Sequence, residues 1–326
     1  MAQAVESRKT EAGFARLASC WVCDSSELSP IHEGRFEFTE YATQDPPLAE
    51  YTGHTFRLMR CEACGFSQPD VLPTLPNYFD RMYDQHWSPE WIEQEFTARY
   101  KDDIFADVLR GLSTRLPISN RRLLDIGAHV GRFIHIAHEH GWQSEGVELN
   151  PRTSAYAQKK TGLPVHQVNA QQLAAEGHTY SAITMLDVLE HIPDPVKLLG
   201  ELRNLLDEDG WLVVKVPCGP NQLMKENLRS RLKPGYRVSV ADNLVHINHF
   251  SPRSLRQALL RAGFTNIDMT IGMPELAPVN GSLRSALSKA FRLGVYHAGR
   301  LIPGGIRSPL ALNLQAYAQK EGSSSR

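Results

Sequence analysis

The sequence predicts an α/β chain in which a doubly wound, mostly parallel sheet follows a small cysteine-bound module. From residue 121 onward, short apolar segments alternate with helical ones, which is the order expected of a parallel sheet. Before that point, four cysteines fall into two pairs of identical spacing. A chain of 326 residues is long enough for both parts, since one domain takes roughly 150 residues.

The composition is that of a globular chain. Hydrophobic residues make up 42% and charged residues 22%, which excludes wholesale disorder and a disulfide scaffold. The 35 Lys and Arg residues balance 36 Asp and Glu residues, so nucleic acid is not an expected partner. No apolar run approaches the roughly 18 residues of a membrane-spanning helix, and the first residues lack a signal peptide's apolar centre. The expected location is the cytoplasm.

The paired cysteines indicate a metal site. Cys20 and Cys23 enclose two residues, and so do Cys61 and Cys64. This spacing lets both sulfurs of a pair turn toward one point, and two such turns complete a tetrahedral thiolate site for zinc. A redox dithiol or accidental pairing is the alternative, but the doubled spacing favours zinc. With four sulfur ligands, this zinc would fold the module rather than catalyse. Residues 1–77 are therefore assigned to a zinc-binding module and its linker.

The elements expected between the cysteines and the sheet are two short strands, a proline-rich linker, an aromatic stretch and one helix, at residues 35–39, 55–59, 67–77, 78–87 and 88–111. The helix begins with Ser88 as N-cap and Pro89 in its first turn.

Seven strands are expected in the sheet, at residues 122–126, 146–149, 164–168, 180–186, 210–216, 264–271 and 312–318. Helices are expected between them at residues 132–140, 151–160, 195–206 and 251–261. Two insertions interrupt this order, at about residues 218–245 and 273–308. The first is rich in Lys and Arg and predicts a mobile basic lid, with a solvated surface as the alternative. The second contains a basic amphipathic helix at residues 281–302.

A glycine-containing loop after the first strand of the sheet indicates a ligand site. Gly127 and Gly131 let a ligand approach the backbone at a helix N-terminus. Glu148 stands 21 residues beyond Gly127, at the spacing where a carboxylate accepts both hydroxyls of a ribose. The loop lacks the three glycines that hold a dinucleotide's pyrophosphate, and Asp125 would repel a phosphate but accept from an ammonium group. A nucleoside-containing cofactor is therefore expected.

Taken together, the motifs resemble class I S-adenosylmethionine-dependent methyltransferases, in particular the small-molecule subgroup with Asp-Val-Leu-Glu-His after the fourth strand. The matching segments are Leu123–Phe133, Gly146–Leu149, Val168–Gln171, Leu186–Pro195 and Gly210–Pro217. The resemblance implies a Rossmann-like, seven-stranded methyltransferase domain at residues 78–326, with S-adenosylmethionine as cofactor. The cysteine module also resembles that of zinc-bearing sugar and natural-product methyltransferases. The expected reaction is O- or C-methylation of a sugar, glycan precursor or natural product.

The same resemblance implies roles for individual residues. The methionine end of the cofactor would be held by Asp125, Gly127 and Gly131. Glu148 would take the ribose hydroxyls, and the adenine would face Asn169 and Ala170, with Leu186 and Asp187 closing the site. Two positions depart from the family pattern: His129 replaces the middle glycine of the loop, and Asn169 stands where aspartate is common.

Three histidines are candidates for a general base, which methyl transfer needs only where the acceptor must lose a proton. His191 follows the fourth strand beside Glu190, and His246 and His249 follow the fifth. We expect the base among these three, with His246 ahead because its loop lies beyond the cofactor core. A turn histidine bonded to backbone is the alternative for His191. His246 and His249 also suit a metal, but no carboxylate trio accompanies them, which favours metal-free chemistry.

Recognition of the substrate is expected outside the common core. Tyr78 and Tyr83 would shield the cofactor's sulfonium or belong to the core. The amphipathic helix of the second insertion suits a membrane or an anionic carrier, with packing across the domain or a dimer interface as the alternative. Two other classes are considered: an RNA methyltransferase, disfavoured by the balanced charge and the lack of an Asn/Asp-Pro-Pro-Tyr motif, and a non-catalytic protein of the same fold.

Overall fold

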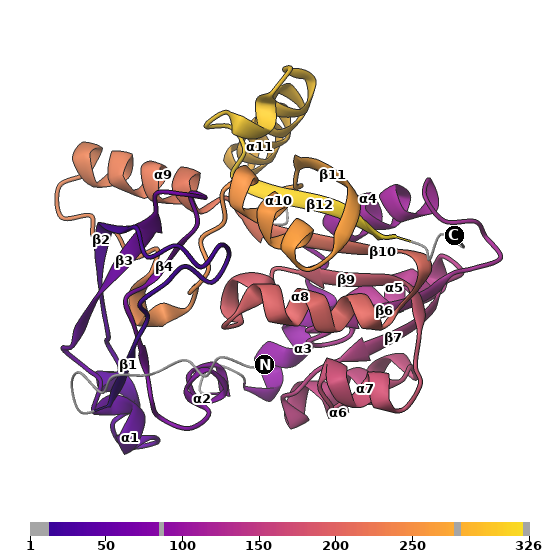
Figure 1. Cartoon of the computed structure of the whole chain (residues 1–326), viewed down its shortest axis with the longest axis horizontal. Coiled ribbons are helices and arrows are strands. Elements are labelled where there is room, and N and C mark those ends of the chain that lie inside the picture. Colours follow the sequence, from indigo (N-terminus) through magenta and orange to yellow (C-terminus); the bar gives the residue numbers. More distant parts are fainter. Residues whose placement is uncertain (1–12, 85–87, 277–281, 322–326) are drawn as a thin grey trace.

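The computed structural model describes residues 13–84, 88–276 and 282–321, and its centre is one mixed sheet of seven strands (Figure 1). The strand order is β11-β12-β10-β9-β6-β7-β8. The strands are β6 (Arg122–Ile126), β7 (Gln143–Val147), β8 (Val165–His166), β9 (Tyr180–Leu186), β10 (Leu206–Pro217), β11 (Phe264–Ile271) and β12 (Asn313–Lys320). Only β12 runs against its two neighbours in this sheet. The predicted fold class, a doubly wound and mostly parallel sheet, is confirmed.

The sheet reverses its strand order beside β6. From β6 the chain adds β7 and β8 on one side, and then crosses back to place β9 and β10 on the other. A crevice opens at such a reversal, outside the carboxyl ends of the strands. The central strands are buried on both faces, and every residue of β9 from Tyr180 to Met185 is buried. This is why they read in the sequence as nearly continuous apolar runs.

The helices beside the sheet are α4 (Asp102–Ser113), α5 (Arg132–Glu139), α6 (Pro151–Thr161), α7 (Ala170–Ala175), α8 (Pro195–Asn204) and α10 (Pro252–Arg261). Their predicted beginnings are confirmed where a cap precedes a proline. The side chains of Asn150, Asp194 and Ser251 each accept a hydrogen bond from a backbone N–H in the first turn of α6, α8 and α10.

The single helix expected at residues 88–111 is two helices, α3 (Pro89–Thr97) and α4. Arg99 adopts a φ of 58° between them, which no right-handed helix accommodates. The apolar positions keep their helical spacing across this break, so the pattern alone does not reveal it. The bend matters because both helices line the pocket described below.

The N-terminal module contains a three-stranded antiparallel sheet of β2 (Leu28–Arg35), β3 (Thr55–Cys61) and β4 (Ser67–Pro69). A second, two-stranded sheet pairs β1 (Phe14–Arg16) with β5 (Val71–Pro73). The strand expected at residues 35–39 lies earlier in the chain, and the expected linker at residues 67–77 contains two strands instead. The reason is tertiary: β4 pairs with β3, so its backbone groups are satisfied in a sheet despite the flanking prolines.

Tyr78, the first residue of α2 (Tyr78–Asp84), packs in an aromatic core of this module. Tyr78 is 3% exposed and donates a hydrogen bond to the backbone oxygen of Asn243 at 2.8 Å. It belongs to a cluster with Phe14, Phe36, Phe38, Tyr51 and Phe56. A shielding role for Tyr78 at the cofactor is therefore wrong, and its alternative as a core residue holds. The side chain of Tyr83 lies outside the described part of the chain.

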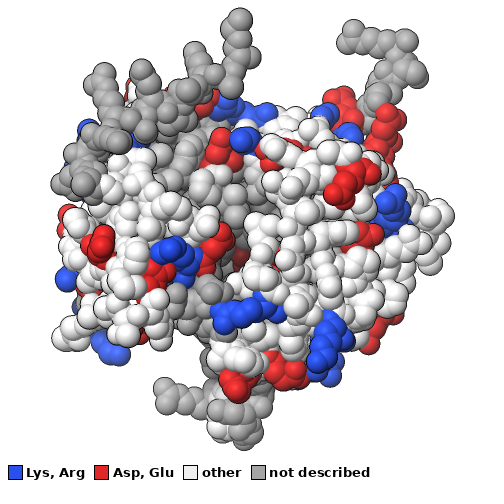
Figure 2. Space-filling model, turned by 90° about the horizontal axis from the view of Figure 1, so that it is seen from below, with Lys and Arg blue, Asp and Glu red and all other residues white. Residues whose placement is uncertain are grey.

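The first insertion contains α9 (Gly219–Leu232) and the short helix η3 (Asp242–Leu244), so a regular helix stands where a mobile lid was expected. The second insertion contains α11 (Leu283–Leu301), close to its predicted bounds. Among the described residues, no helix is both long and apolar enough to cross a membrane. On the face drawn in Figure 2, positive and negative side chains are interspersed rather than gathered by sign.

Candidate functional site

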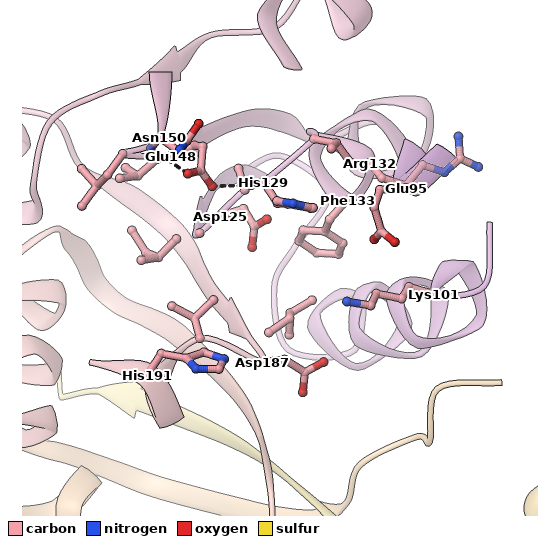
Figure 3. Close-up of a pocket in the computed structure, with 18 of the residues that line it drawn as sticks. Glu95, Lys101, Asp125, His129, Arg132, Phe133, Glu148, Asn150, Asp187 and His191 are labelled. Carbon is pink, nitrogen blue, oxygen red and sulfur yellow. Dashed lines mark hydrogen bonds between the residues drawn. The ribbon is translucent and has the colours of Figure 1, made fainter. Parts of the chain in front are cut away.

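A cavity of about 900 Å³ opens at the carboxyl ends of β6, β7 and β9. Its size is within the range of small-molecule and cofactor sites. Figure 3 shows Asp125, His129 and Glu148 on one side of this pocket and Asp187 and His191 on the other. Lys101 extends between the two sides. The pocket at the strand-order reversal is thus lined by several ionisable side chains.

The loop between β6 and α5 requires its two glycines. Gly127 and Gly131 have φ values of 75° and 78°, in the region that disfavours other residues. A Cβ atom on Gly127 would lie 2.6 Å from a methyl carbon of Val188, and one on Gly131 would lie 2.9 Å from the Cβ of Ala157. Both glycines are therefore needed, because the backbone conformation disfavours other residues and because Val188 and Ala157 leave no room for a Cβ atom.

His129 occupies the same loop with a φ of 51°, a conformation that costs an ordinary residue roughly 1–2 kcal/mol. Its ring lines the pocket and meets the ring of Trp91 edge-on, with centroids 5.4 Å apart. Burial lowers the pKa of His129 to about 4, so the ring is neutral at physiological pH. The departure from a glycine is thus accommodated by a neutral side chain packed against α3.

Glu148 is fixed by the loop that it faces. One carboxylate oxygen accepts from the backbone N–H of His129 at 2.8 Å, and the other from that of Asn150 at 2.9 Å. Burial raises the pKa of Glu148, while these N–H groups act in the opposite direction. The Thr153 side chain also bonds this carboxylate, and with about four lone-pair sites the carboxylate keeps the capacity to accept from a further donor.

Asp125 lies at the end of β6 and is 5% exposed. Thr184 of β9 donates its hydroxyl to Asp125 at 2.6 Å. Burial, together with the nearby negative charge of Glu148, raises the pKa of Asp125 to about 7. A positively charged ligand would favour its ionised form. The ammonium-binding role inferred from the loop sequence stays a prediction.

Asn169 and Ala170 line the same pocket at the beginning of α7. The side-chain oxygen of Asn169 accepts from the backbone N–H of Gln172 at 3.0 Å, and the Gln172 side chain accepts in return. This reciprocal cap explains why asparagine suits the position. An amide oxygen has two lone pairs, so the capping bond leaves one of them unused by that bond.

Leu186 and Asp187 complete the wall from the end of β9. Both carboxylate oxygens of Asp187 accept from the Lys215 ammonium, at 2.6 and 2.8 Å. Burial acts to raise the pKa of Asp187, but the Lys215 charge overrides it and holds that pKa below its ordinary value. Sequence reasoning missed Lys215. The signal was a lysine within the apolar run of residues 211–216 in β10, where its side chain is 3% exposed.

The three candidate histidines separate in space. His191 lines the pocket, and its Nδ1 bonds the backbone oxygen of Val245. Because a carbonyl only accepts, Nδ1 carries the proton and the neutral ring has its lone pair on Nε2. Burial lowers the pKa of His191. His246 packs edge-on against it at 4.8 Å, but burial and the neighbouring His191 lower the pKa of His246 to about 3.

His249 lies farther from the pocket and is 4% exposed. Its Nε2 donates to the backbone oxygen of His246 at 3.1 Å, and its backbone pairs with Ser67 of the cysteine module. The structure therefore brings His191 and His246 together and gives His249 structural contacts. A metal held by His246 and His249 was the disfavoured alternative, and the ligand atoms that lie within 4.8 Å of one another are instead those of Glu190, His191 and His246.

The four cysteines converge as their spacing predicts. The sulfurs of Cys20 and Cys64 are 3.6 Å apart and those of Cys23 and Cys61 are 3.4 Å apart. All four Sγ atoms lie within 4.8 Å of one another, and none is in a disulfide. A tetrahedral zinc site with Zn–S bonds of about 2.3 Å has sulfurs about 3.8 Å apart. The cluster therefore fits a zinc ion.

The chain is similar in sequence to known methyltransferases. A family model described as a methyltransferase domain matches residues 96–269. The ubiquinone biosynthesis O-methyltransferase of Cereibacter sphaeroides is 32% identical over 147 residues, covering 41% of this chain and 60% of that protein. The enzyme of the same name from Thiobacillus denitrificans is 24% identical over 193 residues, with coverages of 57% and 78%.

The chain thus spans 60% of the length of the C. sphaeroides relative. A crystal structure of a SAM-dependent methyltransferase from Archaeoglobus fulgidus matches with a TM-score of 0.45 and 17% identity, over 71% of this chain and 98% of that one.

Proposed function

Because the chain belongs to the methyltransferase-domain family, we propose that it methylates a hydroxyl group of a small molecule, with S-adenosylmethionine as the methyl donor. The donor, when bound, supplies a methyl group on a sulfonium for in-line displacement. The sequence expectation of a sugar, glycan precursor or natural product as acceptor stays a prediction. The O-methyltransferase names of the relatives support an oxygen acceptor over a carbon one.

The observation that carries this proposal is the position of His191 on the pocket wall, with its Nε2 4.0 Å from a carboxyl oxygen of Glu190. Its Nδ1–H is committed to the Val245 carbonyl, which places the basic lone pair on Nε2. The lowered pKa keeps the ring neutral at physiological pH, as a base must be. His246 has a pKa of about 3 and does not line the pocket, so we now place His191 ahead of it.

The other side of the pocket would hold the cofactor. We propose that Asp125 pairs with the ammonium group, Glu148 accepts from the ribose hydroxyls and Asn169 faces the adenine. The carboxylates are held in place before binding by Thr184 and by two backbone N–H groups. Such preorganisation lowers the cost of ordering these side chains around a ligand.

The test is to incubate the protein with S-adenosylmethionine labelled in its methyl group, together with either a small-molecule extract of the host or its total RNA. The proposal expects label in the small-molecule fraction, as a methyl ether. Label confined to RNA would favour an RNA methyltransferase. If the protein binds S-adenosylhomocysteine but labels neither fraction, a non-catalytic role would be favoured. A Glu139→Ala variant, altered on the exposed end of α5, serves as the matched control for pocket carboxylate variants.

We also propose that the cysteine cluster holds one structural zinc ion. Its support is the donor set and the sulfur spacing described above. With every ligand position taken by Cys20, Cys23, Cys61 and Cys64, the ion would stabilise the module and leave no position for a reacting water.

A further inference from the structure

Lys101, the residue before α4, brings a positive charge into the pocket without an anionic partner. Its side chain lines the cavity and, in Figure 3, extends into the space between Phe133 and Asp187. Among the described residues, Lys101 makes no ion pair, and its ammonium group lies 5.6 Å from the centroid of the Tyr100 ring. The Tyr100 hydroxyl donates to Glu95, so this pocket carboxylate is engaged elsewhere. A partly buried, unpaired ammonium group favours a ligand that brings a negative charge.

The arginines that line the pocket differ from Lys101, because each donates to a carboxylate. Arg81 donates to Asp45 at 2.7 Å. Arg99 and Arg132 both donate to Asp102, at 3.0 and 2.6 Å. Two guanidinium groups thus share one carboxylate, and this network adds no negative charge that would offset the neighbouring lysine.

The wall that contains His191 does not neutralise Lys101 either. Both oxygens of Asp187 accept from Lys215, so the charges of this pair cancel. Burial raises the pKa of Glu190, which favours its uncharged form. This side of the pocket therefore leaves the positive charge of Lys101 uncompensated.

Lys101 lies between the cofactor side of the pocket and the proposed base. After burial, its charge is the next cause that lowers the pKa of His129 on the cofactor side. On the opposite side, it contributes, again after burial, to lowering the pKa of His191. An acceptor must stand between the sulfonium of the donor and the base. It would therefore meet positive charge from both the sulfonium and Lys101.

We propose that the acceptor carries a carboxylate beside its hydroxyl group and that Lys101 binds this carboxylate. The inference rests on the proposed function and adds the class of substrate, a hydroxy acid. The hydroxyl oxygen gains the methyl group as its proton passes to Nε2 of His191, and the carbon–sulfur electron pair stays on sulfur. The carboxylate takes no part and stays ionised. A phosphate fits less well, because it carries nearly two charges and Lys101 supplies one.

Anion exchange of the methylated products tests the charge of the acceptor. The full chain is incubated with methyl-labelled S-adenosylmethionine and a small-molecule extract of the host, and unreacted donor is removed. We expect the labelled product to be retained on an anion exchanger at neutral pH, before and after treatment with alkaline phosphatase.

The other outcomes of this separation are distinct. Label only in the unretained fraction would overturn the inference and leave the proposed O-methylation standing. Retention that is lost after phosphatase treatment would overturn the carboxylate in favour of a phosphate. Label in no fraction would overturn the proposed function and this inference with it.

Variants of Lys101 test its part in binding the acceptor. Lys101→Gln should reduce labelling of the retained product by about ten- to a hundredfold, the scale of one hydrogen bond between charged groups. Lys101→Arg keeps the positive charge and should recover part of this loss. The affinity for S-adenosylhomocysteine, measured by calorimetry, should be unchanged in both variants.

The matched control is Lys159→Gln, which removes an exposed lysine of α6 and should label like the unaltered protein. Full labelling by Lys101→Gln would overturn the role of Lys101. S-adenosylhomocysteine retains the carboxylate of the cofactor. If Lys101→Gln loses affinity for it in proportion to the loss of labelling, Lys101 serves the cofactor and the inference is overturned.

Discussion

The cysteine cluster and the pocket are built in opposite ways. The cluster brings four Sγ atoms to within 4.8 Å of one another, and three of its four cysteines are buried. The pocket keeps about 900 Å³ open and holds its charged side chains apart on facing walls. A metal site in which protein side chains fill every ligand position stabilises a fold. An open cavity lined by fixed polar groups can instead bind a small molecule.

One segment connects the two sites. The side chain of Asn243 accepts from the backbone of Glu37 in the cysteine module at 2.7 Å, and His249 pairs with Ser67 next to the second cysteine turn. Between these anchors, the Val245 carbonyl accepts from His191. The closed site therefore helps to position a wall of the open one. Damage to the cysteine cluster should reduce turnover more than cofactor binding.

The largest effect is expected for Cys61→Ser. Removing one thiolate from a four-ligand zinc site forfeits much of a binding free energy that reaches about 10–16 kcal/mol in small zinc modules. Metal analysis should fall from about one zinc per chain to near zero, and hydrogen exchange should show loss of protection in β2 to β4. Cys218→Ser removes a buried cysteine outside the cluster and should keep the zinc. A zinc-free unaltered protein, purified under reducing conditions, would refute the site.

The next effect concerns the open site. His191→Ala should slow turnover by about 10²–10⁴ while leaving the affinity for S-adenosylhomocysteine nearly unchanged, because a base acts on the acceptor. The lowered pKa of His191 also places the acidic limb of the rate profile below the ordinary value of 6.5, since the base must be neutral. The variant His138→Ala alters an exposed histidine of α5 and should be unaffected. Near-normal turnover of His191→Ala would exclude it as the base.

Glu148→Ala should weaken binding of S-adenosylhomocysteine by about 1–3 kcal/mol, the scale for leaving polar groups of a ligand unpaired. Part of this loss would come from the loop, because the N–H groups of His129 and Asn150 lose their acceptor. Calorimetry of S-adenosylhomocysteine binding measures this loss of affinity, with Glu139→Ala as the control variant. Equal affinities would remove Glu148 from the ribose role and leave it a loop-stabilising residue.

The smallest effect is a pH dependence that Asp125 imparts to cofactor binding. Its raised pKa of about 7 means that the free protein holds a proton there below neutral pH, and an ammonium ligand requires that proton to leave. Affinity for S-adenosylhomocysteine should rise by up to about tenfold per pH unit below the pKa and level off above it. Asp125→Asn should remove this slope. An equally steep slope in that variant would assign the proton to another group.

Local patterns determined much of the fold in advance. The two cysteine spacings, the glycine loop at Gly127 and the capped starts of α6, α8 and α10 are each set by a few neighbouring residues, so the sequence was enough to predict them. Strand and helix alternation likewise predicted the seven-stranded sheet. The break at Arg99 was missed because the apolar spacing of α3 and α4 continues across it.

Only the tertiary structure decided what depends on distant partners. It pairs Lys215 with Asp187, places Tyr78 in an aromatic core and puts His191 rather than His246 on the pocket wall. It also turned the apolar side of α11 outward. The sequence by itself determines which residues can fold locally and what chemistry they carry. Which of them meet, and which face solvent, follows from burial and long-range pairing that no short window of sequence contains.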